Sequence, residues 1–209
     1  MPTASMPPRQ RRKKWRNMMA PICLKELTMT LRFDRLLAWV PMMLAIGFSA
    51  PAVAALDVGQ KVAPFTAQAA LAGKPFTYSL QEALAKGPVV VYFFPAAFSV
   101  GCSIEAHAFA DAMDQFAALN TSVIGISTDD METLAKFSSQ VCQGKFPVAS
   151  DESRNITQSF DAVMQTRPEY ANRISYVIAP NGTVVTYYQS LNPFKHVEKM
   201  LDAVKLIRK

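Results

Sequence analysis

Hydrophobic residues follow two different spacings in the part of the chain after residue 55. Two short runs, Val89–Phe94 and Ser122–Ser127, are dominated by β-branched, aromatic and other apolar residues, which is typical of buried strands. Each run precedes a segment with apolar residues at helical spacing, Cys102–Phe116 and Met131–Cys142. The pattern therefore predicts two strand–helix units in succession.

Shorter signals predict the remaining elements. Thr128 or Asp129 is expected to cap the second helix, because either side chain can accept a hydrogen bond from a first-turn N–H. The other expected elements are an extended entry at 55–64, a strand at 76–80, helices at 80–85 and 155–163, hairpin strands at 174–179 and 183–188, and an amphipathic helix that starts at Asn192-Pro193. This order of strands and helices predicts a mixed α/β sheet covered on both faces, which suits a thioredoxin-like fold.

The first quarter of the chain resembles a targeting segment. Arg32 and Arg35 precede the apolar stretch Leu36–Phe48, and Ala52-Val53-Ala54 follows it, which is the layout of a secretory signal peptide. An uncleaved membrane anchor is the alternative, but the apolar stretch is shorter than the ~20 residues that a span needs.

We therefore expect a leader over residues 1–54, with Met29 as the true start and cleavage after Ala54. One domain would remain at 55–209. The protein would be periplasmic or otherwise exported, with no stable membrane association once the leader is removed.

The positive charge of the chain is concentrated in this leader. Residues 1–54 carry nine Lys and Arg against two acidic residues, a net +7, whereas residues 55–209 carry thirteen basic and fourteen acidic residues, a net −1. The two parts together give the +6 of the whole chain. Because the expected domain is nearly neutral, nothing in its charge indicates nucleic acid as a partner.

Cysteine and histidine usage restricts the chemistry further. Cys23 falls in the leader, which leaves Cys102 and Cys142, and no Cys-x-x-Cys pair is present. The only histidines, His107 and His196, are too scattered to suggest a zinc site. We expect no metal and no cofactor.

Cys102 stands where a strand gives way to a helix. Pro95 ends the strand, since it has no N–H to donate, and the turn at 98–101 leads into the helix. A cysteine in a first helical turn lies among unpaired N–H groups at the positive end of the helix dipole. Such surroundings favour the thiolate, which is the nucleophilic form of cysteine.

The residues around Cys102 resemble the peroxiredoxins. The segment Pro-Ala-Ala-Phe-Ser-Val-Gly-Cys at 95–102 matches their signature Pro-x-x-x-Thr/Ser-x-x-Cys. Similarity extends over most of residues 57–208, including Phe-Pro-x-x-Ser-Asp at 146–151 and Arg-x-Ser-Tyr-Val-Ile at 173–178. The most similar type is the bacterioferritin-comigratory, or Q-type, subfamily.

The resemblance implies a role for each matching residue. Cys102 would attack a peroxide and become a sulfenic acid. Ser99 would hydrogen-bond the thiolate and the peroxide, and Pro95 would shield the thiolate and the later sulfenate from water. Arg173 would pair with the thiolate and polarise the peroxide, and Glu105 would orient this arginine.

The sequence departs from the Q-type pattern at the resolving cysteine. Q-type members often carry it five residues after the peroxidatic cysteine, where this chain has His107. Cys142 is the remaining candidate, and we expect it to form an intrachain disulfide with Cys102. The alternative is that an external thiol resolves the oxidised Cys102 and that Cys142 is a passive core residue.

The function expected from these features is an exported thiol peroxidase that reduces hydrogen peroxide and small organic hydroperoxides. Its reductant would be a thioredoxin-like or glutaredoxin-like protein or a small thiol, and the protein would be a monomer or a homodimer. Two alternatives remain at this point: a thiol–disulfide oxidoreductase that acts on proteins, and a non-catalytic binding module in which Cys102 and Cys142 form a permanent bridge.

Overall fold

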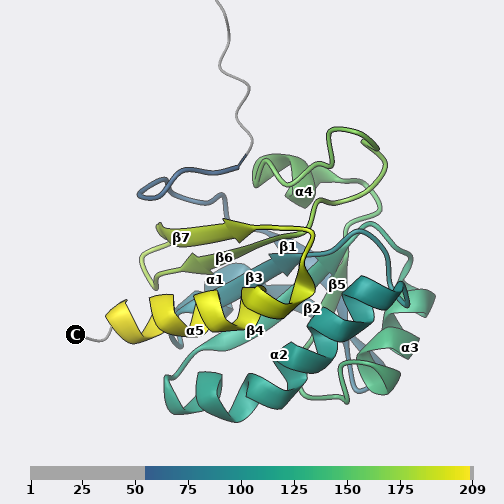
Figure 1. Cartoon of the computed structure of the whole chain (residues 1–209), viewed down its shortest axis with the longest axis horizontal. Coiled ribbons are helices and arrows are strands. Elements are labelled where there is room, and N and C mark those ends of the chain that lie inside the picture. Colours follow the sequence, from purple (N-terminus) through teal and green to yellow (C-terminus); the bar gives the residue numbers. More distant parts are fainter. Residues whose placement is uncertain (1–54, 208–209) are drawn as a thin grey trace, which may run out of the picture. The chain divides into compact units, whose positions relative to one another are not determined.

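The computed structural model describes residues 55–207, which form a seven-stranded sheet with helices on both faces (Figure 1). The strands are β1 (Thr66–Leu71), β2 (Lys74–Ser79), β3 (Val89–Phe93), β4 (Ser122–Ser127), β5 (Val148–Ser150), β6 (Ile174–Ile178) and β7 (Val184–Gln189). The helices are α1 (Leu80–Leu84), α2 (Val100–Ala118), α3 (Met131–Gln140), α4 (Asn155–Ser159), the 3-10 turn η1 (Pro193–Lys195) and α5 (His196–Ile207). None of these helices is long and apolar enough to cross a bilayer. The leader expected at 1–54 lies outside the described residues.

The sheet has the order β2-β1-β5-β4-β3-β6-β7. Strands β3, β4 and β5 run parallel, whereas the β1–β2 and β6–β7 hairpins pair antiparallel on the two sides. This is the mixed α/β sheet that the sequence predicts, with the thioredoxin-like fold. The parallel strands end together at the edge where the loop before α2 begins.

Alternate residues of β3 pack into separate cores on the two faces of the sheet. Val90, Tyr92 and the following Phe94, just after β3, face the core covered by α2, α3 and α5, while Val89, Val91 and Phe93 face the core covered by α1 and α4. All five residues of β3 are fully buried, which explains the uninterrupted apolar run in the sequence.

Two of the strands are not anticipated by the sequence pattern. β1 consists largely of alanine and glutamine, residues with a weak preference for strands, and β5 has only three residues. β1 is held by pairing with β2 across a tight turn in which Ala72 and Gly73 both have positive φ (51° and 80°). Residues 66–71 therefore form a strand through long-range pairing rather than local preference.

Helices α3 and α4 end earlier than expected, and the expected cap of α3 is wrong. Helix α4 stops at Ser159 rather than 163, because Asp161 has a positive φ of 50° and Val163 instead forms a β-bridge with Ala171. Helix α3 ends at Gln140, which leaves Cys142 in the following turn. Its cap is Asp130, whose carboxylate accepts from the Thr133 N–H at 2.8 Å, and neither Thr128 nor Asp129 has this role.

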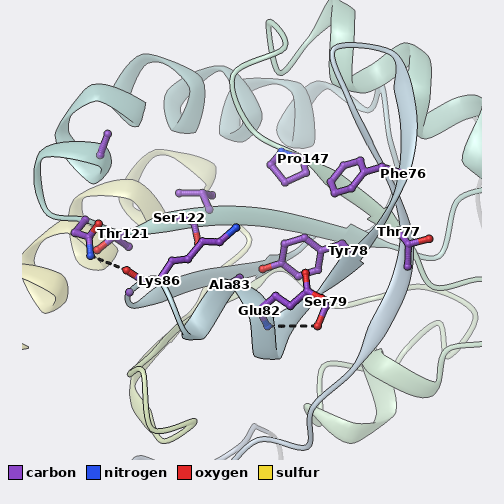
Figure 2. Close-up of a pocket in the computed structure, with 14 residues that line it drawn as sticks. Phe76, Thr77, Tyr78, Ser79, Glu82, Ala83, Lys86, Thr121, Ser122 and Pro147 are labelled. Atoms are coloured by element: carbon purple, nitrogen blue, oxygen red, sulfur yellow. Dashed lines mark hydrogen bonds between the residues drawn. The ribbon is translucent and has the colours of Figure 1, made fainter.

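A cavity of about 530 Å³ lies beside β2 and α1, at the end of the molecule away from Cys102. Figure 2 shows Phe76, Tyr78 and Lys86 around it. Ala117, near the C-terminal end of α2, also lines it and is about 22 Å from Cys102 along the helix axis. The cavity is therefore separate from the site described next.

Candidate active site

Cys102 lies in the first turn of α2 and is 1% exposed. Ser99 is the N-cap, and the first helical hydrogen bond runs from the Ser103 N–H to the Ser99 carbonyl at 2.9 Å. The N–H groups of Val100, Gly101 and Cys102 precede this bond, so they are not used within the helix. The sulfur therefore lies at the end of a 19-residue helix where negative charge is stabilised.

Arg173, just before β6, contacts Cys102. β6 pairs with β3 so that Ile174 is opposite Phe93, which brings Arg173 level with the start of the Cys102 loop. Its Nη2 lies 3.2 Å from Cys102 Sγ, and its Nη1 donates to the Gly101 carbonyl at 3.4 Å. A Cβ at position 101 would lie 3.0 Å from Nη2, so glycine leaves room for the guanidinium.

Glu105 binds the same guanidinium one helical turn after Cys102. Its Oε2 accepts a short charge-assisted hydrogen bond from Arg173 Nη1, and the carboxyl group is fully buried. Burial raises the pKa of Glu105 from 4.5 to about 7, although Arg173 acts in the opposite direction. Cys102, Arg173 and Glu105 thus form one buried, connected cluster.

His196 extends this cluster, and the sequence analysis does not assign it a role. It begins α5 and is fully buried, with Nδ1 2.8 Å from Ser175 Oγ and 3.3 Å from Glu105 Oε1. Its Nε2 lies 3.0 Å from the Ser190 carbonyl. Burial lowers the pKa of His196 from 6.5 to about 4, so the imidazole is neutral at ordinary pH.

The loop between β3 and α2 contains the other two expected residues, Pro95 and Ser99. Pro95 is partly buried at the start of the loop. Ser99 is exposed, and its Oγ donates to the Ala96 carbonyl at 3.0 Å; it makes no hydrogen bond to Cys102 Sγ in this conformation. The loop also places Phe98 at a positive φ of 60°, which is a strained conformation for an aromatic residue.

Asp129, which follows β4, is hydrogen-bonded to the loop between β3 and α2. Its Oδ2 accepts from the Ala97 N–H at 2.6 Å and from Ser127 Oγ at 2.7 Å. The carboxylate is therefore occupied by a contact 32 residues away in sequence, which explains why the neighbouring Asp130 caps α3.

Comparison with known proteins identifies the family. Residues 58–187 match the AhpC/TSA family. The chain is a member of this family, the peroxiredoxins. A chloroplastic peroxiredoxin Q of Sedum lineare is 31% identical over 64% of this chain and 76% of its own length.

Solved structures agree with this assignment. Peroxidoxin BcpB of Mycobacterium tuberculosis superposes with a TM-score of 0.67 at 29% identity, over 74% of this chain and 99% of its own. A variant of PrxQ from Xylella fastidiosa superposes with a TM-score of 0.66 at 21% identity, over 74% of this chain and 98% of its own. This second likeness supports the fold alone. This peroxiredoxin is therefore of the Q type, a peroxidase that uses a peroxide substrate and a thioredoxin-type thiol donor.

The second cysteine of this peroxiredoxin is not bonded to Cys102. Cys142 is a fully buried free thiol in the turn after α3, and burial raises its pKa well above the ordinary range. Gln143 Nε2, next to it in sequence, lies 3.5 Å from Nδ1 of His107 on α2. The turn of Cys142 is thus packed beside the helix that carries Cys102.

The described residues contain no group of acidic, cysteine and histidine side chains that could hold a metal ion. The cluster can instead stabilise negative charge on sulfur and on a neighbouring oxygen, because Arg173 contacts the sulfur and Cys102 lies in the first turn of α2.

Proposed function

We propose that Cys102 is the peroxidatic residue of a catalytic cycle with two thiols. The Cys102 thiolate attacks one peroxide oxygen, the S–O bond forms as the O–O bond breaks, and the leaving oxygen takes a proton to become water or an alcohol. The product is Cys102 sulfenic acid. The substrates are hydrogen peroxide and small organic hydroperoxides.

The observation that carries this assignment is the 3.2 Å contact between Arg173 Nη2 and Cys102 Sγ in a buried site. A guanidinium stays charged throughout the reaction and offers several N–H donors in a fixed plane. It therefore stabilises the thiolate first and the charge on the breaking O–O bond afterwards. Pro95 would limit access of water, and Ser99 would turn its hydroxyl from Ala96 to the bound peroxide.

In the second step, Cys142 attacks the sulfenic sulfur, a disulfide forms and water leaves. The two thiols are free and buried in the structure, so the first turn of α2 and the Cys142 turn must open before they meet. Support comes from the Gln143–His107 contact, which puts the Cys142 turn beside the position where Q-type relatives often carry their resolving cysteine. An external dithiol, thioredoxin-like or glutaredoxin-like, then reduces the disulfide and is itself oxidised.

Strain in the loop favours this opening. The ring of Phe98 packs edge-on against the ring of Phe137 of α3, with the ring centroids 5.3 Å apart. The Val141 and Cys142 N–H groups both donate to the Phe137 carbonyl. Release of Phe98 from its positive φ recovers about 1–2 kcal/mol and frees the side chain that touches α3. Unwinding at Cys102 is thereby coupled to loosening at Cys142.

Two assays test the cycle. One follows peroxide consumption under excess dithiol, and the other is mass analysis of the protein after one equivalent of peroxide without reductant. The wild type is expected to give a Cys102–Cys142 disulfide. Cys102→Ser is expected to abolish oxidation, whereas Cys142→Ser should keep rapid oxidation but stop at the sulfenic acid. Full turnover of Cys142→Ser with a protein dithiol would show that an external thiol resolves Cys102.

Export is proposed on the layout of residues 29–54 alone. Sequencing the N-terminus of the protein isolated from cells tests this part. A first residue at Ala55 in the exported fraction is the expected result, and an intact leader on the cytosolic protein would contradict it.

A further inference from the structure

The ring nitrogens of His196 have partners that fix its protonation. The Ser190 carbonyl can only accept a hydrogen bond, so the Nε2 at 3.0 Å must carry a hydrogen and donate it. In a neutral imidazole, Nδ1 then has a lone pair. Ser175 Oγ, at 2.8 Å, donates its hydrogen to that lone pair.

The same Nδ1 also faces a carboxylate oxygen. Glu105 Oε1 lies 3.3 Å away and has no hydrogen-bond partner, although it is completely buried. If Glu105 were ionised and His196 neutral, two lone pairs would face each other in a site without water, which is unfavourable. A proton on Glu105 Oε1 removes this conflict, because the acid then turns a hydrogen toward Nδ1. Nδ1 accepts it together with the hydrogen of the nearer Ser175 hydroxyl, in one three-centre hydrogen bond.

We propose that Glu105 is protonated when the enzyme is ready to react, that its hydrogen stays on the carboxyl group and is directed at His196 Nδ1, and that His196 is thereby a positioning residue for the Arg173 charge at Cys102. The inference rests on the proposed role of Cys102. The proton is placed on the carboxyl group because an imidazolium would add another charge to a fully buried site that already contains Arg173. Burial raises the pKa of Glu105 to about 7 and lowers that of His196 to about 4, in agreement with this placement.

Few other charges act on the pair. Arg173, just before β6, faces both groups, and Cys102 lies on the same helix as Glu105. Tyr92 of β3 interacts with Cys142, Glu105, Cys102 and Arg173, but burial raises its pKa well above the ordinary value and keeps it neutral. Arg173 is therefore the one permanent charge that faces the pair among the described residues.

The proton controls where the Arg173 charge is used. When Glu105 is ionised, its carboxylate neutralises the guanidinium that also binds Cys102 Sγ. When Glu105 is protonated, the guanidinium acts on the sulfur without this competition, which favours the thiolate. By linkage, formation of the thiolate must in turn favour retention of the proton on Glu105.

The test follows the pH dependence of Cys102 alkylation by a small haloacetamide, read by mass on the peptide that contains Cys102. His196→Asn places an amide N–H opposite Glu105 Oε1, which stabilises the carboxylate. We expect the alkylation midpoint to move upward by about one pH unit, a tenfold loss of thiolate at lower pH. His107→Asn, on the exposed histidine of α2, is the matched control and should leave the midpoint unchanged.

Glu105→Gln keeps the proposal testable if His196→Asn folds poorly. The glutamine amide copies the protonated carboxyl, because it donates to His196 and accepts from Arg173, so the midpoint should stay at or below that of the wild type. A higher midpoint in Glu105→Gln, or an unchanged one in folded His196→Asn, would overturn the proposal.

A ¹⁵N NMR titration of the ring nitrogens gives a readout that a structural role alone would not change. In the His107→Asn background, His196 should keep the neutral form with hydrogen on Nε2 from about pH 5 to 8, with its Nδ1 signal shifting near pH 7 as Glu105 ionises. A His196 imidazolium at pH 6 would also overturn the proposal. Peroxide oxidation is measured on the same samples: an unreactive wild type refutes the role of Cys102, whereas normal oxidation with an unshifted midpoint refutes only this inference.

Discussion

Replacing Glu105 by glutamine should make the protein more stable at alkaline pH, although it removes half of a buried ion pair. In the wild type, burial raises the pKa of Glu105 in the folded state above its unfolded value of 4.5. The folded state therefore binds a proton more tightly than the unfolded state does. The stabilisation of the folded state by this proton is complete below about pH 4.5. It is lost as the pH rises through about 7, the pKa of Glu105 in the folded state.

The size of the effect follows from the two pKa values. A rise from 4.5 to about 7 corresponds to a loss of about 3 kcal/mol of folding free energy at pH 8 relative to acidic pH. Glutamine does not titrate and keeps both contacts of the protonated acid. The stability difference between Glu105→Gln and the wild type should therefore grow from near zero at pH 4.5 to about 3 kcal/mol in favour of the variant at pH 8.

Urea unfolding under reducing conditions, followed by circular dichroism at pH 4.5, 6 and 8, measures this difference. Because both proteins share every other titrating group, subtracting the two curves isolates Glu105. A variant that is less stable than the wild type at pH 8 would refute the reasoning, since it would show that the Arg173 ion pair outweighs the cost of burying the carboxylate.

Three further substitutions probe the geometry of the site and its supports. Gly101→Ala puts a Cβ 3.0 Å from Arg173 Nη2, so the rate of peroxide oxidation should fall about tenfold, while alanine in a helix keeps or raises the melting temperature. Asp129→Asn weakens the charge-assisted bond to the loop before α2 and should cost about 1–2 kcal/mol in urea unfolding, with faster hydrogen exchange in that loop. Gly125→Ala places a Cβ 2.8 Å from the Tyr92 ring and should destabilise the fold by about 1–3 kcal/mol; an unchanged unfolding midpoint would contradict the packing described for that ring.

The sequence predicts the parts of this molecule that depend on local patterns. The uninterrupted apolar runs predict β3 and β4 almost to the residue, and the strand–helix junction places Cys102 correctly in a first helical turn. Arg173 lies 71 residues from Cys102, so no local spacing links the two residues, and only the resemblance to peroxiredoxins does. The β3–β6 register supplies the physical link.

Other features could not be read from the sequence because they arise from packing. His196 is a single histidine at a helix start, and it becomes buried because α5 packs against β6 and β7. β1 forms although its residues prefer helices, since pairing with β2 and β5 outweighs the local preference. The one signal that the sequence offered for His196 was its place, as a polar residue, among the apolar positions of the helix α5.

The opposite effects of burial on Glu105 and His196 have a consequence for folding itself. In the unfolded chain at about pH 5.5, the imidazole carries a proton and the carboxyl group does not, whereas in the folded protein the order is reversed. Folding then relocates one proton from His196 to Glu105, with no net exchange with the buffer through this pair. The heat of folding at that pH should include the difference between the ionisation enthalpies of the two groups, and this contribution should be the same in every buffer. A buried acid can thus be kept beside the reactive thiol without making the fold sensitive to mild acid.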